Sequence, residues 1–342
     1  MSNEKDFDFI MRSITAGLTG DACKDGPYLR EKCEEYKDHK YGKEILRACG
    51  RLMYELVPED QRQALNDAMS KDLKGYEATL DEVKFNLYQK NYTKALAIIE
   101  ELVRKIEAMH LFDDDRVSEY HVFDETFQEV LYDYRSKGGK EIRHASFPYN
   151  EVYGLYGSIL LELQRYEDSR AALEKGLKWN PMDFSLRSEY IETYKAAGDM
   201  DTFYCLSVEA FSYAYRAAYA ARCYRNIGYY FVEKKLFKVA YACYLLSLQY
   251  EDSTSAKSEL FYIEHTVDEI FNEPTIEDLK QYAKQYGFPS HPDTEIMGLA
   301  YQYGKHFLEK NNKEAASYFL VITYELSKDP ELKELLKNLA DA

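Results

Sequence analysis

Residues 150–181 read NEVYGLYGSILLELQRYEDSRAALEKGLKWNP, and this stretch decides the expected fold. Its apolar residues return at helical spacing, so we expect one helix, a tight turn and a second helix. Gly157 and Gly176 allow the two backbones to approach closely, while aromatic side chains such as Tyr153 fill the space between them. Pro181 stops the second helix because it lacks a backbone N–H. The stretch therefore predicts one antiparallel helix pair.

The same pattern recurs along the chain. When the pattern is laid on itself, one close-packing position is shared by residues 34 and 37 positions apart, namely Gly157, Ile191 and Gly228. The matching place in each second helix is held by Ser169, Phe203 and Ala240. The middle copy is weak because Phe203 is large where a small residue is expected. The longer spacing implies a few extra residues near positions 213–219.

Two further copies extend the series. One has Asn91, Tyr92 and Ala95 around its turn, and the other has Gly304 at the close-packing position and Ala316 in its second helix. This spacing resembles the tetratricopeptide repeat (TPR) family, whose unit is about 34 residues long. The resemblance covers residues 75–342 with gaps. It is clear near 76–109, 150–183 and 221–254, and weaker over 184–217, 255–290 and 297–330. It implies an all-α, right-handed α-solenoid of antiparallel helix pairs.

Three segments lie outside the repeat pattern. Residues 1–74 predict a helical N-terminal segment with helices over 6–18, 27–38, 41–56 and 59–70, the second carrying Pro27 in its first turn. Residues 110–147 read as an insertion with an aromatic-rich helix and a break at Gly138 and Gly139. We favour a surface helix, held by Phe123, Phe127, Val130 and Tyr134, over a flap on the binding face. A charged capping helix is expected over 329–340.

Composition and charge limit the class of function. The chain has 342 residues, 46% of them apolar, and we find no run of period-two alternation that would indicate strands. Its net charge of −16 disfavours nucleic acid and anionic membranes as partners, and no apolar run approaches the length of a membrane span. Residues 1–74 carry no basic recognition helix that would indicate a DNA-binding module. An acidic start is the opposite of a secretory signal, so we expect a cytoplasmic protein.

The residue types that usually support catalysis are scattered. Six cysteines lie at least ten positions apart and are interpreted as reduced core residues, with disulfides in an exported protein as the alternative. His265, Asp268 and Glu269 share a helical face that could ligate a metal, but a solvated face is the better interpretation. No phosphate-binding loop or paired-histidine motif is present. We expect no catalytic residue, metal or cofactor; an enzyme built from distant residues is the third alternative.

The TPR resemblance also implies a groove. In that family the first helices of the pairs line the inner wall, and the equivalent positions here are Ser188, Glu192, Lys195, Arg222, Arg225 and Tyr229, with Asn226 beside them. Arg222 and Arg225 share one helical face, which suits a carboxylate or an acidic peptide. Residues 213–240 carry six Lys and Arg against one Glu, a local +5. The alternative is that these arginines pair with acidic neighbours across the repeat interface.

The function expected from these observations is binding. The favoured hypothesis is a non-catalytic scaffold or adaptor that holds a protein or peptide in the groove. The runner-up is a peptide- or ligand-responsive regulator whose N-terminal helices act on a target. The 33 tyrosines could stack on single-stranded nucleic acid, but filling the gaps between helices explains them better. The partner, the process and the oligomeric state are not predicted.

Overall fold

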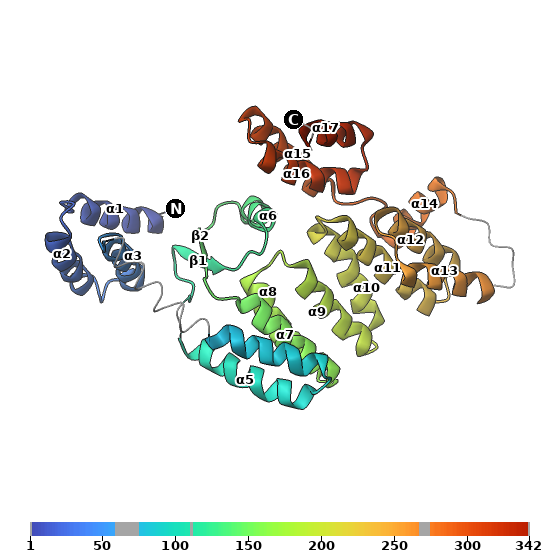
Figure 1. Ribbon diagram of the computed structural model, residues 1–342, viewed down its shortest axis with the longest axis horizontal. Coiled ribbons are helices and arrows are strands. Elements are labelled where there is room, and N and C mark those ends of the chain that lie inside the picture. Colours follow the sequence, from blue (N-terminus) through green and yellow to red (C-terminus); the bar gives the residue numbers. More distant parts are fainter. Residues whose placement is uncertain (1, 59–74, 110–111, 267–273, 341–342) are drawn as a thin grey trace. The chain divides into compact units, whose positions relative to one another are not determined.

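The computed structural model describes residues 2–58, 75–109, 112–266 and 274–340 (Figure 1). The chain forms two compact units. Unit 1 consists of Met1–Val122 with Ser136–Leu155, and unit 2 consists of Phe123–Arg135 with Tyr156–Ala342. The chain therefore leaves unit 1, contributes one short segment to unit 2, returns to unit 1, and then completes unit 2.

Unit 1 begins with a small helical bundle. Its helices are α1 (Ser2–Ala16), α2 (Ala22–Glu35) and α3 (Gly42–Glu55), and their shared core includes Ile14, Leu29, Tyr41, Ile45 and Cys49. The prediction that α2 starts at Pro27 is wrong. Asp21 caps the helix by accepting a hydrogen bond from the Cys23 backbone N–H, so α2 starts at Ala22 and contains Pro27. The helix predicted over 59–70 lies outside the described residues.

A helix pair follows the N-terminal bundle in unit 1. A helix over residues 75–88 is followed by α5 (Tyr92–Met109), and α7 (Tyr149–Glu162) begins in the same unit. The Tyr153 hydroxyl donates a hydrogen bond to Glu107 Oε1 at 2.8 Å, and Lys84 pairs with Glu151 at 2.6 Å. These contacts fix the start of α7 on the preceding helix pair.

The insertion departs from the sequence expectation. It contains a parallel strand pair, β1 (Ser118–His121) and β2 (Glu141–His144), with Ser118 opposite Glu141, joined by α6 (Thr126–Ser136). No period-two alternation in the sequence indicates these two strands, which have four residues each. Strands this short contain too few residues for an alternating pattern to be visible in the sequence. The helix is confirmed, but it begins after Phe123.

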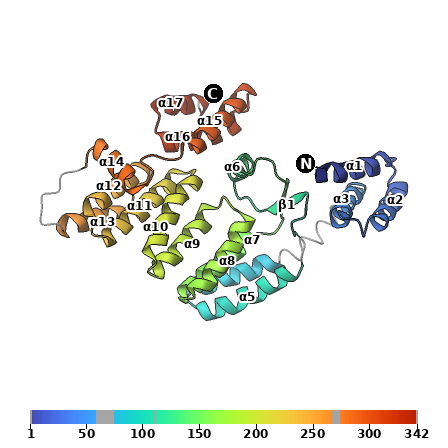
Figure 2. The ribbon, with the colours of Figure 1, turned by 180° about the vertical axis from the view of Figure 1, so that it is seen from behind.

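Unit 2 is built of successive helix pairs, and both views show the helices from α8 to α13 side by side (Figures 1 and 2). The all-α prediction is confirmed for its elements: α8 (Tyr166–Trp179), α9 (Phe184–Ala196), α10 (Met200–Glu209), the 3₁₀ helix η1 (Ala210–Tyr213), α11 (Ala217–Glu233), α12 (Phe237–Tyr250), α13 (Thr254–Thr266), α14 (Ile276–Tyr286), α15 (Thr294–Glu309), α16 (Lys313–Ser327) and α17 (Pro330–Ala340). The 3₁₀ helix η1 and residues 214–216 connect α10 to α11, and α17 is the last helix of the described residues.

One contact recurs in the pairs of unit 2. A Cβ atom built on Gly157 would lie 2.4 Å from Leu173, and the equivalent atoms on Gly228 and Gly304 would lie 3.0 Å from Tyr244 and 2.7 Å from Leu320. In each case the large side chain follows the glycine by 16 residues. In the weak copy the large and the small side chain exchange places. The large Ile191 stands where the other copies have glycine, and the small, buried Ser207 follows it by the same 16 residues. The copies therefore share one register.

Candidate functional site

A polar hollow of about 270 Å³ lies on unit 2. It is lined by Glu192 and Lys195 of α9, Arg222, Arg225, Asn226 and Tyr229 of α11, Tyr244 of α12, and Ser255 and Glu259 of α13. The structure thus brings together the groove residues expected from the sequence, except Ser188. That side chain is buried, at 7% exposure, and does not line the hollow.

The position of the hollow follows from the helix register. Arg222, Arg225, Asn226 and Tyr229 are spaced by three and four residues, so they share one face of α11. The opposite face of α11 carries buried residues of the core, Tyr224, Ile227 and Phe231. Burying that face leaves the polar face of α11 directed away from the core, between α9 and α13.

Sequence reasoning missed three lining residues. Glu259 follows the start of its repeat, at residue 255, by the same distance that separates Arg225 from the start of the repeat at 221. The register used for α11 would therefore have found Glu259. Tyr244 was visible only as a packing residue, and Ser255 carries no distinguishing signal.

The arginines of the hollow pair with acidic neighbours. Glu192 lies between two basic groups, with its Oε1 2.9 Å from Lys195 Nζ and its Oε2 3.8 Å from Arg222 Nη2. Arg225 Nη1 lies 2.7 Å from Glu251 Oε2. Arg222 therefore pairs across the interface of two repeats, as the pairing alternative expects, whereas Arg225 pairs within its own repeat, 221–254.

The local excess of positive charge is also compensated beyond the hollow. Arg216 pairs with Glu125, and Lys234 Nζ lies 2.9 Å from Asp201 Oδ1. The count of +5 over residues 213–240 considered one segment alone, whereas these acidic partners come from other helices. Pairing weakens the long-range attraction that a bare cluster would exert on an acidic partner.

Some of the binding capacity of the hollow is unused. Arg222 Nε is buried and has no hydrogen-bond partner among the described residues. The Arg222 and Glu192 side chains are 40% and 30% exposed, and an ion pair that is this accessible and this long contributes at most about 1 kcal/mol. Lys195 Nζ lies 4.5 Å from the centre of the Tyr229 ring. A ligand can therefore exchange with Glu192 at little energetic cost.

The pKa of Glu189 depends on the charge of Arg222. Burial raises the pKa of Glu189 above its ordinary value, and the Arg222 guanidinium opposes that rise. We expect Arg222→Met to raise the pKa of Glu189 further, because the opposing charge is removed. A carboxyl whose folded-state pKa is raised contributes its full stability below its unfolded pKa, and loses that contribution as the pH rises through the folded pKa. The stability of Arg222→Met should therefore fall more steeply than wild type above the ordinary glutamate range.

NMR titration of the Glu189 carboxyl carbon measures this effect. Lys238→Met is a matched control, because Lys238 is exposed and its substitution removes one positive charge at a different place. It should leave the Glu189 titration unchanged. An unchanged or lowered Glu189 pKa in Arg222→Met would contradict the assigned interaction.

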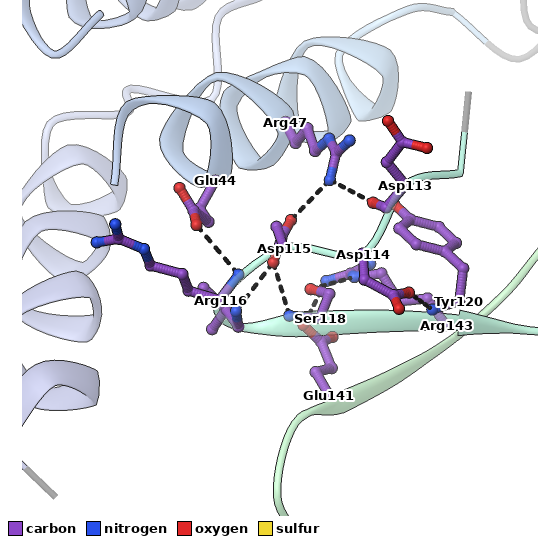
Figure 3. A network of polar contacts seen from close by, with 11 residues as sticks. Glu44, Arg47, Asp113, Asp114, Asp115, Arg116, Ser118, Tyr120, Glu141 and Arg143 are labelled. Atoms are coloured by element: carbon purple, nitrogen blue, oxygen red, sulfur yellow. Dashed lines mark hydrogen bonds and ion pairs between the residues drawn. The ribbon is translucent and has the colours of Figure 1, made fainter. Parts of the chain in front are cut away.

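A second hollow, of about 570 Å³, lies in unit 1 between the start of α3 and the start of the insertion. There Arg47 donates to the Asp113 carbonyl at 2.6 Å and to Asp115 Oδ2 at 3.0 Å, while the Arg116 backbone N–H donates to Glu44 Oε1 at 3.1 Å (Figure 3). Burial acts to raise the pKa of Asp115, but hydrogen bonds from the Val117 and Ser118 backbone and Arg47 hold it below its ordinary value. These contacts hold the start of the insertion against α3.

The described residues offer little for catalysis. In the described ranges, no three His, Cys, Asp or Glu side chains are placed to hold a metal. His265 Nδ1 lies 2.8 Å from the Phe261 carbonyl oxygen, and Asp268 and Glu269 lie outside the described residues. All six cysteines are free thiols; Cys49, Cys223 and Cys243 are buried, but Cys23 and Cys205 are exposed, which corrects the expectation of six core residues. None of the described helices is long and apolar enough to cross a membrane.

No family model and no curated protein matches the chain. The chain is similar to a TPR protein. That protein is YrrB, whose crystal structure is described as having an unusual peptide-binding site; the match has 15% identity and a TM-score of 0.29, and covers 63% of this chain and 98% of YrrB. At that TM-score the likeness carries no argument about the site, and the TPR-like arrangement is supported here by the helix pairs and their shared glycine contact.

Proposed function

We propose that this protein is a non-catalytic scaffold that binds a segment of another protein in the hollow lined by α9, α11 and α13. The observation that carries the proposal is that the first helices of three successive pairs supply nearly all of its lining residues. Helical repeats use such continuous walls to bind extended segments or helices of their partners.

The chemistry of the hollow selects the segment. The Arg222–Glu192 ion pair is long and partly exposed, so a partner carboxylate can take the place of Glu192 beside Arg222. The Tyr229 and Tyr244 rings offer apolar surface next to that position. We therefore propose a partner segment with an acidic residue next to an apolar one.

Paired affinity capture tests this function. The wild-type chain, Arg222→Gln with Arg225→Gln, and the charge-matched control Lys238→Gln with Lys310→Gln are immobilised, and a lysate of the source organism is passed over each. Lys238 and Lys310 are exposed and do not line the hollow. A partner should be lost from the arginine variant and kept by the control. Its Kd for the arginine variant should be at least about tenfold higher, because a hydrogen bond to a charged group contributes about 1.5–3 kcal/mol.

The controls make a negative result informative. Circular dichroism must show that both variants keep their helical content and melting temperature. Equal capture by all three proteins would show that the partner does not bind in the hollow.

A further inference from the structure

The helix of the insertion, α6, belongs to unit 2, although its neighbours in the chain, β1 and β2, belong to unit 1. It presents a narrow apolar stripe. Phe127 and Leu131, four residues apart, are fully buried, whereas Tyr134 is 51% exposed. The Phe127 ring centre lies 5.4 Å from that of Tyr215 and 6.2 Å from that of Phe319. This is the anchor spacing of an amphipathic helix in a groove.

Side chains of unit 2 recognise the N-terminal end of α6. The Phe127 backbone N–H, which has no acceptor within its own helix, donates to the Tyr318 hydroxyl at 3.1 Å. Asn180 Nδ2 donates to Asp124 Oδ2 at 3.1 Å and to Gln128 Oε1 at 3.0 Å. Arg216 pairs with Glu125, which precedes Phe127 by two residues.

The other end is recognised through a single arginine. Arg135 Nη1 donates to the Ser212 carbonyl oxygen at 2.5 Å, and Arg135 Nε lies 3.1 Å from Glu295 Oε1. Beyond it, Lys137 and Gly138 have left-handed backbone conformations, with φ of 55° and 69°, and end the helix. The contacting residues come from the end of α8, η1, the start of α11, α15 and α16, so they form one continuous seat for a short helix.

We propose that this seat is a helix-binding groove, that α6 fills it in cis, and that a helix of a partner protein displaces α6 from it. The partner helix carries the pattern that the seat reads in α6. That pattern is an aromatic residue and a leucine four apart, an acidic residue two positions before the aromatic, and an arginine four positions after the leucine. The complementary charges at both ends of α6 and its two buried apolar anchors define this pattern.

A peptide supplied in trans tests the proposal on the full chain. The probe is a labelled peptide of residues 122–137, VFDETFQEVLYDYRSK, and fluorescence anisotropy measures its binding. In wild type the tethered α6 competes at an effective concentration of about millimolar. Phe127→Asp with Leu131→Asp removes both anchors in cis, so the variant should bind the peptide at least about tenfold more tightly than wild type does. A Tyr134→Ala peptide should bind like the unchanged peptide, and a Phe127→Ala peptide should not bind.

A charge-reversal experiment tests the proposal if the variant without the two anchors does not fold. Arg216→Glu leaves the apolar anchors intact and reverses one charge of the seat. The Arg216→Glu chain should bind a peptide carrying Glu125→Arg more tightly than it binds the unchanged peptide, and wild type should show the opposite order. Arg222→Gln with Arg225→Gln should leave peptide binding unchanged, which separates this groove from the hollow on α9, α11 and α13.

Two results would overturn the proposal. One is a folded anchor variant that binds the peptide no more tightly than wild type, together with no change of peptide preference in the Arg216→Glu chain. The other is concentration-dependent dimerisation of wild type that a charge reversal at Arg216 abolishes. That result would assign the seat to α6 of a second copy instead of a partner helix.

Discussion

Replacing Arg187 with alanine should lower the free energy of unfolding of unit 2 by about 2–4 kcal/mol. The guanidinium of Arg187 lies 3.4 Å from the centre of the Tyr213 ring, and its Nη2 donates to the Pro181 carbonyl oxygen at 3.0 Å. The side chain is only 15% exposed, and burial lowers its pKa. A cation on an aromatic face contributes most where water is excluded, and truncation also leaves a cavity.

Urea unfolding followed by circular dichroism measures this loss. Arg187→Lys should recover only part of the stability, because an ammonium group cannot stack on the ring and donate to Pro181 at once. Arg165→Ala is the control, since Arg165 is 44% exposed and its ion-pair partner Asp168 is 55% exposed; it should cost at most about 0.5 kcal/mol. Equal losses for Arg187→Ala and Arg165→Ala would show that the Tyr213 contact contributes nothing.

Gly157→Ala should destabilise the chain by about 1–3 kcal/mol. Alanine normally stabilises a helix relative to glycine, by up to about 1 kcal/mol. At this position the new Cβ would lie 2.4 Å from Leu173 Cγ, so either Leu173 or the two helices must shift. The cost of overpacking should therefore exceed the gain in helix propensity.

A matched glycine and a double substitution check the cause. Gly298 lies in α15 and has no atom within 4 Å of an added Cβ, so Gly298→Ala should stabilise the chain. Leu173→Ala should relieve the clash, so Gly157→Ala with Leu173→Ala should cost less than the sum of the two single changes. If Gly157→Ala and Gly298→Ala have the same sign, the close contact is not a determinant of stability.

The sequence predicted the helix pairs well because their signal is repeated and local. Gly157, Gly228 and Gly304 mark the same contact in three pairs, and each contact depends only on a side chain 16 residues later. A single residue can also set a helix end, as Gly287 does where it ends α14 in the left-handed conformation with φ of 78°. Proline was misleading as a sign of a helix start at Pro27. The predicted start of α2 was wrong because Asp21 caps the helix earlier.

The insertion could not be predicted in the same way, because its structure depends on distant residues. α6 is held by Tyr318, which lies 191 residues from Phe127, and periodicity contains no information about such a contact. The compensation of charge in the hollow also depends on contacts between separate elements. The TPR resemblance places Arg222 and Arg225 in a groove, but their acidic partners Glu192 and Glu251 approach them only after the helices stack.

Site-specific photocrosslinking tests the central claim, that the hollow on α9, α11 and α13 binds a segment of another protein. A photoreactive phenylalanine analogue is placed at Asn226, inside the hollow, and in a second chain at the exposed Lys238. After irradiation in a lysate of the source organism, mass spectrometry identifies the crosslinked peptides. We predict a protein segment with an acidic residue beside an apolar one, crosslinked from position 226 and absent from position 238. The same adducts from both positions, or none from position 226, would contradict the claim.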